Sequence, residues 1–334
     1  MIMNSSKFLF LVMLVMSTLI TLSSNNWLGM WMGLEMNLMS FIPLISKNKN
    51  KKSSQAMMTY FLIQSIGSIT LLFSITMSPI MFSYHEFMEN LMKILMSISI
   101  FMKTGVAPFH FWLPEMMANM NWIMCSIMMT WQKIAPLFIM SNMPSLNWFN
   151  YFGIMMSVAV GSIGGLNQTS LRKIMAYSSI NHMGWMMMFM FMNSSWYKYL
   201  IIYSLLIIMI CLFLNMKNMY FINQMISSSY SLMEKLTYIT LFLSMGGLPP
   251  FMGFMPKWMV IQSMMNSDMY IIMMIMMMFS LITLFYYTQL MMSFMLSYSM
   301  MNKFINNKPI NKFMLFMLMF INLTLPILVA MGFF

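Results

Sequence analysis

Long apolar runs separated by short polar stretches are the feature that most constrains this sequence. A membrane-spanning helix needs about 20 apolar residues, and polar punctuation divides the chain into about eleven segments of that kind. They extend over 8–23, 27–46, 56–79, 91–117, 122–140, 148–165, 171–192, 199–216, 236–265, 269–293 and 313–333. Only 7% of the residues are charged, against about 25% in soluble domains. The sequence therefore predicts an all-α polytopic membrane protein.

The chain is expected to form a single membrane domain over residues 1–334, because no polar stretch is long enough for a separate soluble domain. Charged and interrupted segments occupy about 27–266, and C-terminal helices follow over about 269–333. The beginning, MIMNSSKFLFLV, lacks arginine and continues into an apolar helix. It is therefore unlike a transit peptide or a cleavable signal.

The distribution of basic residues predicts the orientation. By the positive-inside rule, the loops on the inner side of a membrane carry an excess of Lys and Arg. If the N-terminus lies on the inner side, twelve of the seventeen basic residues lie on that side. These twelve are Lys7, Lys47, Lys49, Lys51, Lys52, Arg172, Lys173, Lys217, Lys235, Lys303, Lys308 and Lys312. The net charge of +11 is then explained by loop topology, and nucleic-acid binding is not needed to account for it.

Four ionisable side chains remain at membrane depth, Glu35, Lys103, Lys133 and Lys257, and Glu115 lies nearer a segment end. Each charge at the bilayer centre costs about 2.5–3.5 kcal/mol. We therefore expect these groups to be paired or to contact internal water. Opposite charge and burial shift the proton affinity of such groups in opposite directions, which is the balance that a proton relay needs.

Two histidines add titratable groups at the same depth. His110 directly follows the Pro108 break, and it is a candidate to carry protons between Lys103 and Lys133 or to form a structural hydrogen bond. His182 is expected to hydrogen-bond Ser, Asn or backbone between helices.

Two membrane segments contain both a lysine and helix-breaking residues. In KTGVAPFHFWLP (103–114) the lysine precedes the break, and in GGLPPFMGFMPKW (246–258) it follows the break. Irregular backbone at membrane depth is tolerated only inside protein or beside a wet cavity. Interrupted segments in the two halves of a chain are typical of an ion path between inverted repeats. The simpler alternative, two kinked helices, leaves the lysines unexplained.

These positions suggest a specific hypothesis for proton transfer. Glu35 would gate Lys103, which loads a proton from one side. Lys133 would pass the proton laterally, with water or His110 as an intermediate. Lys257 would release it toward the other side.

The sequence favours neither a metal site nor a redox site. Methionine occurs 59 times, which is typical of AT-rich mitochondrial genes, and Met at helical spacing in lipid is mostly packing. Cys125 and Cys211 form no CxxC pair and are expected to be reduced packing residues. An iron–sulfur cluster needs four ligands, and no dinucleotide-binding GxGxxG is present.

Five stretches together resemble one protein family: WLGMWMGLEMNLMSFIPL, KTGVAPFHFWLPEMM, MTWQKIAPL, GGLNQTSLRKIMAYSSINHMGWM and GGLPPFMGFMPKW, within residues 27–258. The chain resembles the subunit 2 family of mitochondrial NADH:ubiquinone oxidoreductase (respiratory complex I), in an insect-like form. These subunits are related to Mrp antiporters. The resemblance implies two inverted repeats, each with one discontinuous helix, and about eleven helices where fuller family members have fourteen.

The resemblance also implies roles for particular residues. The family's gating glutamate matches Glu35, and its partner lysine on the first broken helix matches Lys103. The connecting lysine matches Lys133, and the exit-side lysine on the second broken helix matches Lys257. All four are present in this chain.

The implied setting is the mitochondrial inner membrane, with the N-terminus on the matrix side. Partners would be other membrane-arm subunits, accessory subunits and lipids. NADH, flavin, iron–sulfur clusters and ubiquinone would be used elsewhere in the complex, with no cofactor in this chain. Two alternatives remain: a structural membrane subunit without its own pumping, and a stand-alone cation/proton antiporter.

Overall fold

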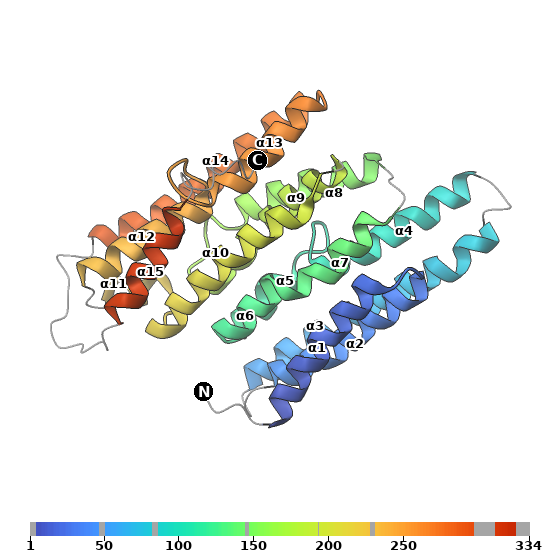
Figure 1. Cartoon of the computed structure of the whole chain (residues 1–334), viewed down its shortest axis with the longest axis horizontal. Coiled ribbons are helices and arrows are strands. Elements are labelled where there is room, and N and C mark those ends of the chain that lie inside the picture. Colours follow the sequence, from blue (N-terminus) through green and yellow to red (C-terminus); the bar gives the residue numbers. More distant parts are fainter. Residues whose placement is uncertain are drawn as a thin grey trace. The chain divides into compact units, whose positions relative to one another are not determined.

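The computed structural model of the chain describes residues 5–46, 51–81, 86–143, 147–192, 194–227, 231–296 and 311–324. Within this part every regular element is an α-helix (Figure 1), and the β-type pairing found there is an isolated antiparallel bridge between Ser170 and Phe221. The all-α prediction is confirmed. The chain divides into two compact units, residues 1–157 and 158–334.

The first unit is built on helices that pack in sequence order. Its helices are α1 (Ser5–Ser23), α2 (Trp27–Ile45), α3 (Lys51–Met81), α4 (Glu86–Thr104), α5 (Trp112–Ala118), α6 (Trp122–Met129), α7 (Trp131–Ser141) and the beginning of α8 (Asn147–Ile163). Helices α1, α2 and α3 lie side by side, and α3 lies along α4 (Figure 1). A Cβ on Gly33 would lie 2.4 Å from Thr21 Cγ2, so a small residue is what allows α2 to approach α1 closely.

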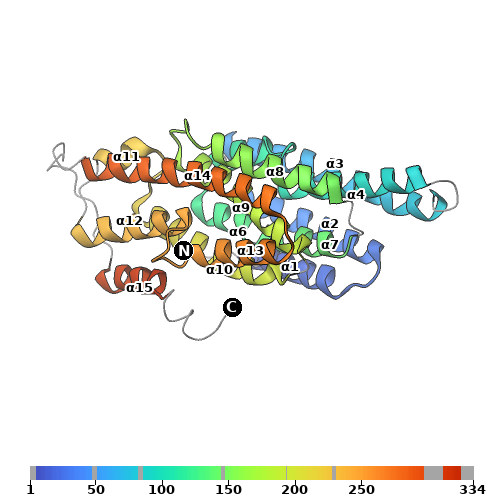
Figure 2. The same ribbon diagram turned by 90° about the horizontal axis from the view of Figure 1, so that it is seen from above.

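The second unit surrounds a buried helix. It contains α9 (Leu171–Phe191), α10 (Trp196–Lys217), α11 (Ile222–Ser227), α12 (Leu232–Gly246), α13 (Phe254–Asn266), α14 (Tyr270–Leu296) and α15 (Lys312–Asn322). Helix α9 packs against α10 and α13, and α15 lies against α12 (Figure 2). Most residues of α9 are buried, including Ser178, Ser179, Asn181 and His182. A helix surrounded by protein can carry polar groups that a lipid-facing helix cannot.

Six helical stretches in the described part are long and apolar enough to cross a membrane: α1, α2, α3, α6 with α7, α10 and α14. The other predicted segments are shorter or divided in the structure. Segments 91–117 and 236–265 are each divided into two helices, α4 with α5 and α12 with α13. Segments 148–165 and 171–192 correspond to α8 and α9. The last segment, 313–333, is described only as far as residue 324.

Two of the basic residues assigned to inner loops are little exposed and lie near helix ends. Lys217 is in the last turn of α10 with its side chain 5% exposed, and Lys235 is buried near the beginning of α12. Lys217 Nζ lies 2.6 Å from Glu234 Oε1, so a cation at the C-terminus of α10 meets an anion in the first turn of α12. The side of the membrane on which these two residues lie stays a prediction. Lys47, Lys49, Lys303 and Lys308 lie outside the described residues.

Both helix breaks begin at a glycine with positive φ. Gly105 (φ 74°) follows α4, and Gly247 (φ 79°) follows α12. In each case two successive backbone N–H groups donate to a carbonyl in the last turn, that of Phe101 or Leu243. Left-handed glycine is the usual way to end a helix and satisfy its last carbonyls. The two breaks therefore share one local mechanism.

The loop that forms the second break packs tightly against α12, the helix that precedes it. A Cβ built on Gly253, just before α13, would lie 1.6 Å from the carbonyl oxygen of Ser244 in α12. The Met252 N–H donates to the Asn322 carbonyl of α15 at 3.1 Å. The loop between α12 and α13 is thus held by direct backbone contacts on two sides.

We expect Gly253→Ala to destabilise the second unit by more than about 3 kcal/mol, because the new methyl group meets backbone and overpacking of this kind cannot relax. Gly246→Ala is the matched control, since its Cβ would have its nearest neighbours at 3.8 Å. The thermal unfolding midpoint of the purified protein in lipid measures both variants. Equal midpoints for the two variants would contradict this packing.

Candidate functional site

Lys103 lies in a buried, polar corner of the first unit. It belongs to the last turn of α4, where a cation is favoured by the helix dipole. Its aliphatic stem lies along Gly67 of α3, whose Cβ would be 3.2 Å from Lys103 Cγ. Gln64 Nε2, also on α3, donates to the Lys103 carbonyl oxygen at 3.1 Å. Gly67 therefore leaves room for the Lys103 side chain. The Gln64 side-chain amide provides a hydrogen-bond donor for the Lys103 carbonyl, next to the helix break.

A small cavity opens next to the Lys103 side chain. About 10 Å³ of it is open to the centre of a water-sized sphere, close to what a single water needs. The lining residues are Leu34, Asn37, Tyr60, Gln64, Lys103, Met128, Gln132 and Pro136. Four of the eight carry uncharged polar groups, so the ammonium shares its surroundings with hydrogen-bonding partners rather than with aliphatic groups alone.

An interhelical hydrogen-bond network forms one wall of this cavity. Gln132 Nε2 of α7 donates to Asn37 Oδ1 of α2 at 3.1 Å. The Tyr60 hydroxyl of α3 donates to Gln132 Oε1 at 3.4 Å. One glutamine therefore joins three helices, and all three side chains are buried. Buried polar networks of this kind are costly unless their members are satisfied.

The other residues proposed for the first half, Glu35, Lys133 and His110, do not line this cavity. Glu35 is half-buried on α2, and its charge acts on Lys103, but the described residues contain no direct ion pair between them. Lys133 is buried on α7, directly after Gln132. His110 is buried in the break, where its Nδ1 lies 3.2 Å from the Pro108 carbonyl oxygen.

Lys257 occupies the equivalent break in the second unit. It lies in the first turns of α13, and its Nζ donates to the Gly246 carbonyl oxygen of α12 at 2.8 Å. A Cβ on Gly247 would lie 2.9 Å from Lys257 Cδ, so a larger residue there would displace the lysine. Lys257 therefore stabilises the C-terminal end of the helix that precedes it.

The far end of α13 borders an open pocket of about 240 Å³. Its lining combines the last turns of α13 with the connection between α9 and α10. The residues are Phe189, Ser194, Ser195, Lys198, Met259, Gln262, Ser263 and Asn266. A single helix thus runs from the buried Lys257 to a polar opening.

Sequence reasoning found the charged residues but missed the neutral polar ones. Asn37, Tyr60, Gln64 and Gln132 were not proposed as site residues, although each is a polar residue within an apolar segment. That signal was available in GLEMN, FLIQS and TWQK.

His182 donates to or accepts from the Tyr199 hydroxyl at 2.9 Å, so an interhelical bond is present with a tyrosine as partner.

Comparison with known proteins identifies the family. The family model described as "NADH:quinone oxidoreductase/Mrp antiporter, TM" matches residues 24–283. The chain belongs to this NADH:quinone oxidoreductase/Mrp antiporter family. NADH-ubiquinone oxidoreductase chain 2 of Locusta migratoria is 43% identical over 311 residues, covering 92% of this chain and 91% of the relative. Chain 2 of Anopheles gambiae is 45% identical over 316 residues, with coverage of 92% and 91%.

A solved structure shows the same fold. A chain of respiratory complex I from Thermus thermophilus, determined with bound aureothin, superposes with a TM-score of 0.84 at 18% identity. The match covers 98% of this chain and 79% of that chain. The all-helical architecture is therefore the antiporter-like membrane fold of the NADH:quinone oxidoreductase/Mrp antiporter family.

Among the described residues no group of three or more His, Cys, Asp or Glu side chains is placed to hold a metal ion. Cys125 and Cys211 are buried free thiols. The candidate site in each unit is thus a set of buried lysines with amide, hydroxyl and backbone partners. Such groups can bind and release protons.

The amide network makes a test by double-mutant cycle possible. Gln132→Leu should cost about 1–3 kcal/mol of unfolding free energy, because it strands the buried Asn37 and Tyr60 groups. Asn37→Leu should lower the unfolding free energy much less in the Gln132→Leu background than in the wild type. In the double variant both members of the Gln132–Asn37 hydrogen bond are gone, and neither is left unpaired. Unfolding midpoints of the two single variants and the double variant give the coupling. Additivity within about 0.5 kcal/mol would contradict the network.

Proposed function

We propose that this chain is a core membrane-arm subunit of proton-pumping NADH:ubiquinone oxidoreductase. The observation that carries the proposal is the pair of buried lysines, Lys103 and Lys257, each beside a helix break. The Lys257 ammonium donates to the Gly246 carbonyl oxygen, and Lys103 lines a cavity that also contains amide and hydroxyl groups. An intramembrane ionisable residue is a functional group by default. Membership of a family that includes Mrp antiporters and the two insect chain 2 relatives support the same assignment.

The proposal includes a specific membrane architecture. The chain forms one membrane domain of about eleven transmembrane helices, arranged as two inverted repeats. The pairs α4 with α5 and α12 with α13 are the discontinuous helices of the two repeats. The shared glycine-terminated break supports this equivalence, and so do the two compact units. The relay occupies about residues 27–266, and the C-terminal helices of about 269–333 complete the bundle.

Within this architecture each charged residue has a role. Lys103 takes up a proton through the amide-lined cavity, and the nearby charge of Glu35 controls its affinity. Lys133 carries the proton laterally, with His110 or water as an intermediate. Lys257 releases it along α13 toward the pocket that contains Gln262 and Asn266.

The setting follows from the same assignment. The chain is placed in the mitochondrial inner membrane with its N-terminus on the matrix side, as the distribution of basic residues predicts. Its partners are other membrane-arm subunits, accessory subunits and lipids. Electron transfer from NADH through flavin and iron–sulfur clusters to ubiquinone belongs to other subunits, which drive this one by conformational or electrostatic change.

Two lysines of α4 provide a matched test. Lys103→Gln should lower the number of protons translocated per NADH oxidised, because the buried relay group is gone. Lys93→Gln should leave the ratio unchanged, since Lys93 is a partly exposed residue that pairs with Glu89 on the same helix. Lys257→Gln should behave like Lys103→Gln. Proton uptake and NADH oxidation are measured together on the complex reconstituted into vesicles.

The outcomes separate the alternatives. Assembly of all variants with unchanged stoichiometry would mean that the chain is a structural subunit whose charges only stabilise it. Purification of the chain outside any NADH-oxidising assembly, with cation/proton exchange retained, would instead establish a stand-alone antiporter.

A further inference from the structure

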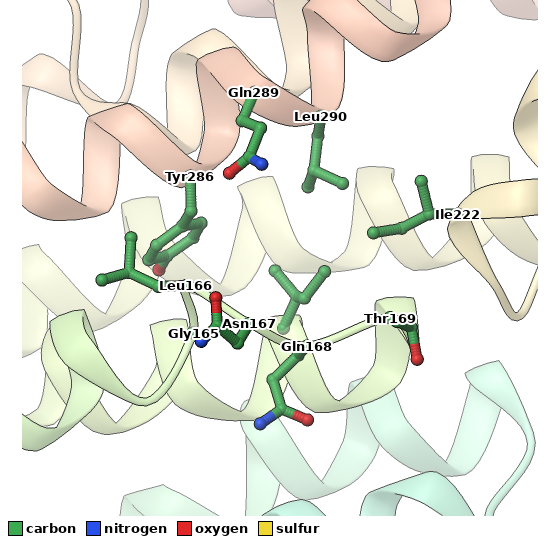
Figure 3. Close-up of a pocket in the computed structure, with 10 residues that line it drawn as sticks. Gly165, Leu166, Asn167, Gln168, Thr169, Ile222, Tyr286, Gln289 and Leu290 are labelled. Atoms are coloured by element: carbon green, nitrogen blue, oxygen red, sulfur yellow. The ribbon is translucent and has the colours of Figure 1, made fainter.

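A polar pocket of the second unit is not used by the relay described above. It has a volume of about 380 Å³ and lies where the connection from α8 to α9 faces α14 (Figure 3). Its lining residues are Gly165, Leu166, Asn167, Gln168, Thr169, Ile174, Ile222, Tyr286, Gln289 and Leu290. The polar members are neutral amides and hydroxyls, which suit water better than an anion or a cation.

Tyr286 connects this pocket to the interior. Its side chain is 2% exposed and points from α14 toward the α8–α9 connection (Figure 3). A Cβ on Gly165 would lie 2.9 Å from Tyr286 Cε1, so glycine lets the ring lie directly against the backbone. The Tyr286 hydroxyl has no hydrogen-bond partner in the described part of the chain. A buried hydroxyl in this state needs water as a partner.

Further hydroxyl groups continue inward from Tyr286. The ring centroids of Tyr286 and Tyr287 are 4.5 Å apart, and the Tyr286 and Ser178 hydroxyls lie close enough to affect the Tyr287 hydroxyl. Like that of Tyr286, the Tyr287 hydroxyl makes no direct hydrogen bond within the described residues. A bridging water is the ordinary solution for polar groups at such a distance.

The series ends at His182. The Tyr203 hydroxyl lies near Ser179, the neighbour of Ser178 on α9. The Tyr203 ring lies 5.0 Å from the His182 ring, and His182 Nδ1 lies 2.9 Å from the Tyr199 hydroxyl. The groups therefore lead stepwise from an open pocket to a buried imidazole, whose ordinary titration range is near neutral pH.

We propose that the pocket is a water-filled proton inlet, and that Tyr286 and Tyr287 pass protons from it to the buried hydroxyl and imidazole groups around His182. This inlet rests on the proposed pumping function and adds a second point of entry, in the second unit. At each hydroxyl a proton arrives on the oxygen while the original proton leaves to the next acceptor. Each tyrosine and serine therefore stays neutral, and only the terminal imidazole gains charge.

The side of entry follows from the proposed orientation. The end of α8, the beginning of α9, the connection that contains α11 and the C-terminal half of α14 all fall on the matrix side. Tyr287 also lies beside Gly246, at 3.8 Å from its Cβ position, and Gly246 is the acceptor for Lys257. The path thus passes, at Tyr287, close to the backbone group that binds Lys257, which releases the proton in the proposed relay.

Cysteine labelling tests the access. Gln289→Cys lines the pocket, whereas Phe285→Cys lies one turn away on the exposed face of α14. The native cysteines are buried. We expect a membrane-impermeant, positively charged methanethiosulfonate to modify Gln289→Cys from the matrix side of the intact complex, and to leave Phe285→Cys unmodified. A Gln289→Cys thiol that reacts from neither side, or only from the opposite side, would overturn the inlet.

Pumping measurements test the hydroxyl path. Tyr286→Phe keeps the ring and should slow NADH-driven proton translocation roughly fivefold, the effect of one lost hydrogen bond in the rate-limiting step. Thr288→Val is the control, because its hydroxyl bonds the Phe285 carbonyl and does not line the pocket. Wild-type pumping in Tyr286→Phe, with pumping lost in Lys257→Gln, would overturn the inlet and leave the relay standing. Wild-type pumping in both would overturn the proposed function itself.

Discussion

An ammonium group inside a bilayer needs a polar partner, and this fold provides one by ending a helix at membrane depth. Lys257 donates to the last carbonyl of α12, and Lys103 lies in the last turn of α4. Both helices end at a left-handed glycine. The interrupted helix therefore stabilises the buried cation. A helix break and a buried lysine occur together in both units for that reason.

Partial pairing is what separates a proton carrier from a structural salt bridge. The buried pair of Lys217 and Glu234 is a direct contact of opposite charges at helix ends, which suits a fixed link between α10 and α12. Lys103 instead borders a cavity with neutral amide and hydroxyl groups, while Glu35 acts on it without direct contact. Neutral partners can contact a lysine in either protonation state, which is what the proposed relay role of Lys103 requires.

Much of this arrangement could be predicted from the sequence, because helix breaks and membrane charges are local signals. KTGVAPFHFWLP and GGLPPFMGFMPKW contain the glycines at which α4 and α12 end. Which side chains meet was not predictable, because it depends on the rotation of each helix about its axis. The bond between Gln132 and Asn37 spans 95 residues. The ion pair of Lys217 with Glu234 was not predictable either, since a buried pair has the same composition as a solvated loop.

The most direct test is a density map of the assembled membrane arm in lipid at a resolution that shows ordered water. This account predicts water in contact with the Lys103 ammonium and with the amides of Asn37, Gln64 or Gln132. It also predicts that Lys257 keeps its contact with the end of α12. A dry cavity with Lys103 locked against a carboxylate, or either ammonium turned toward lipid, would contradict the account.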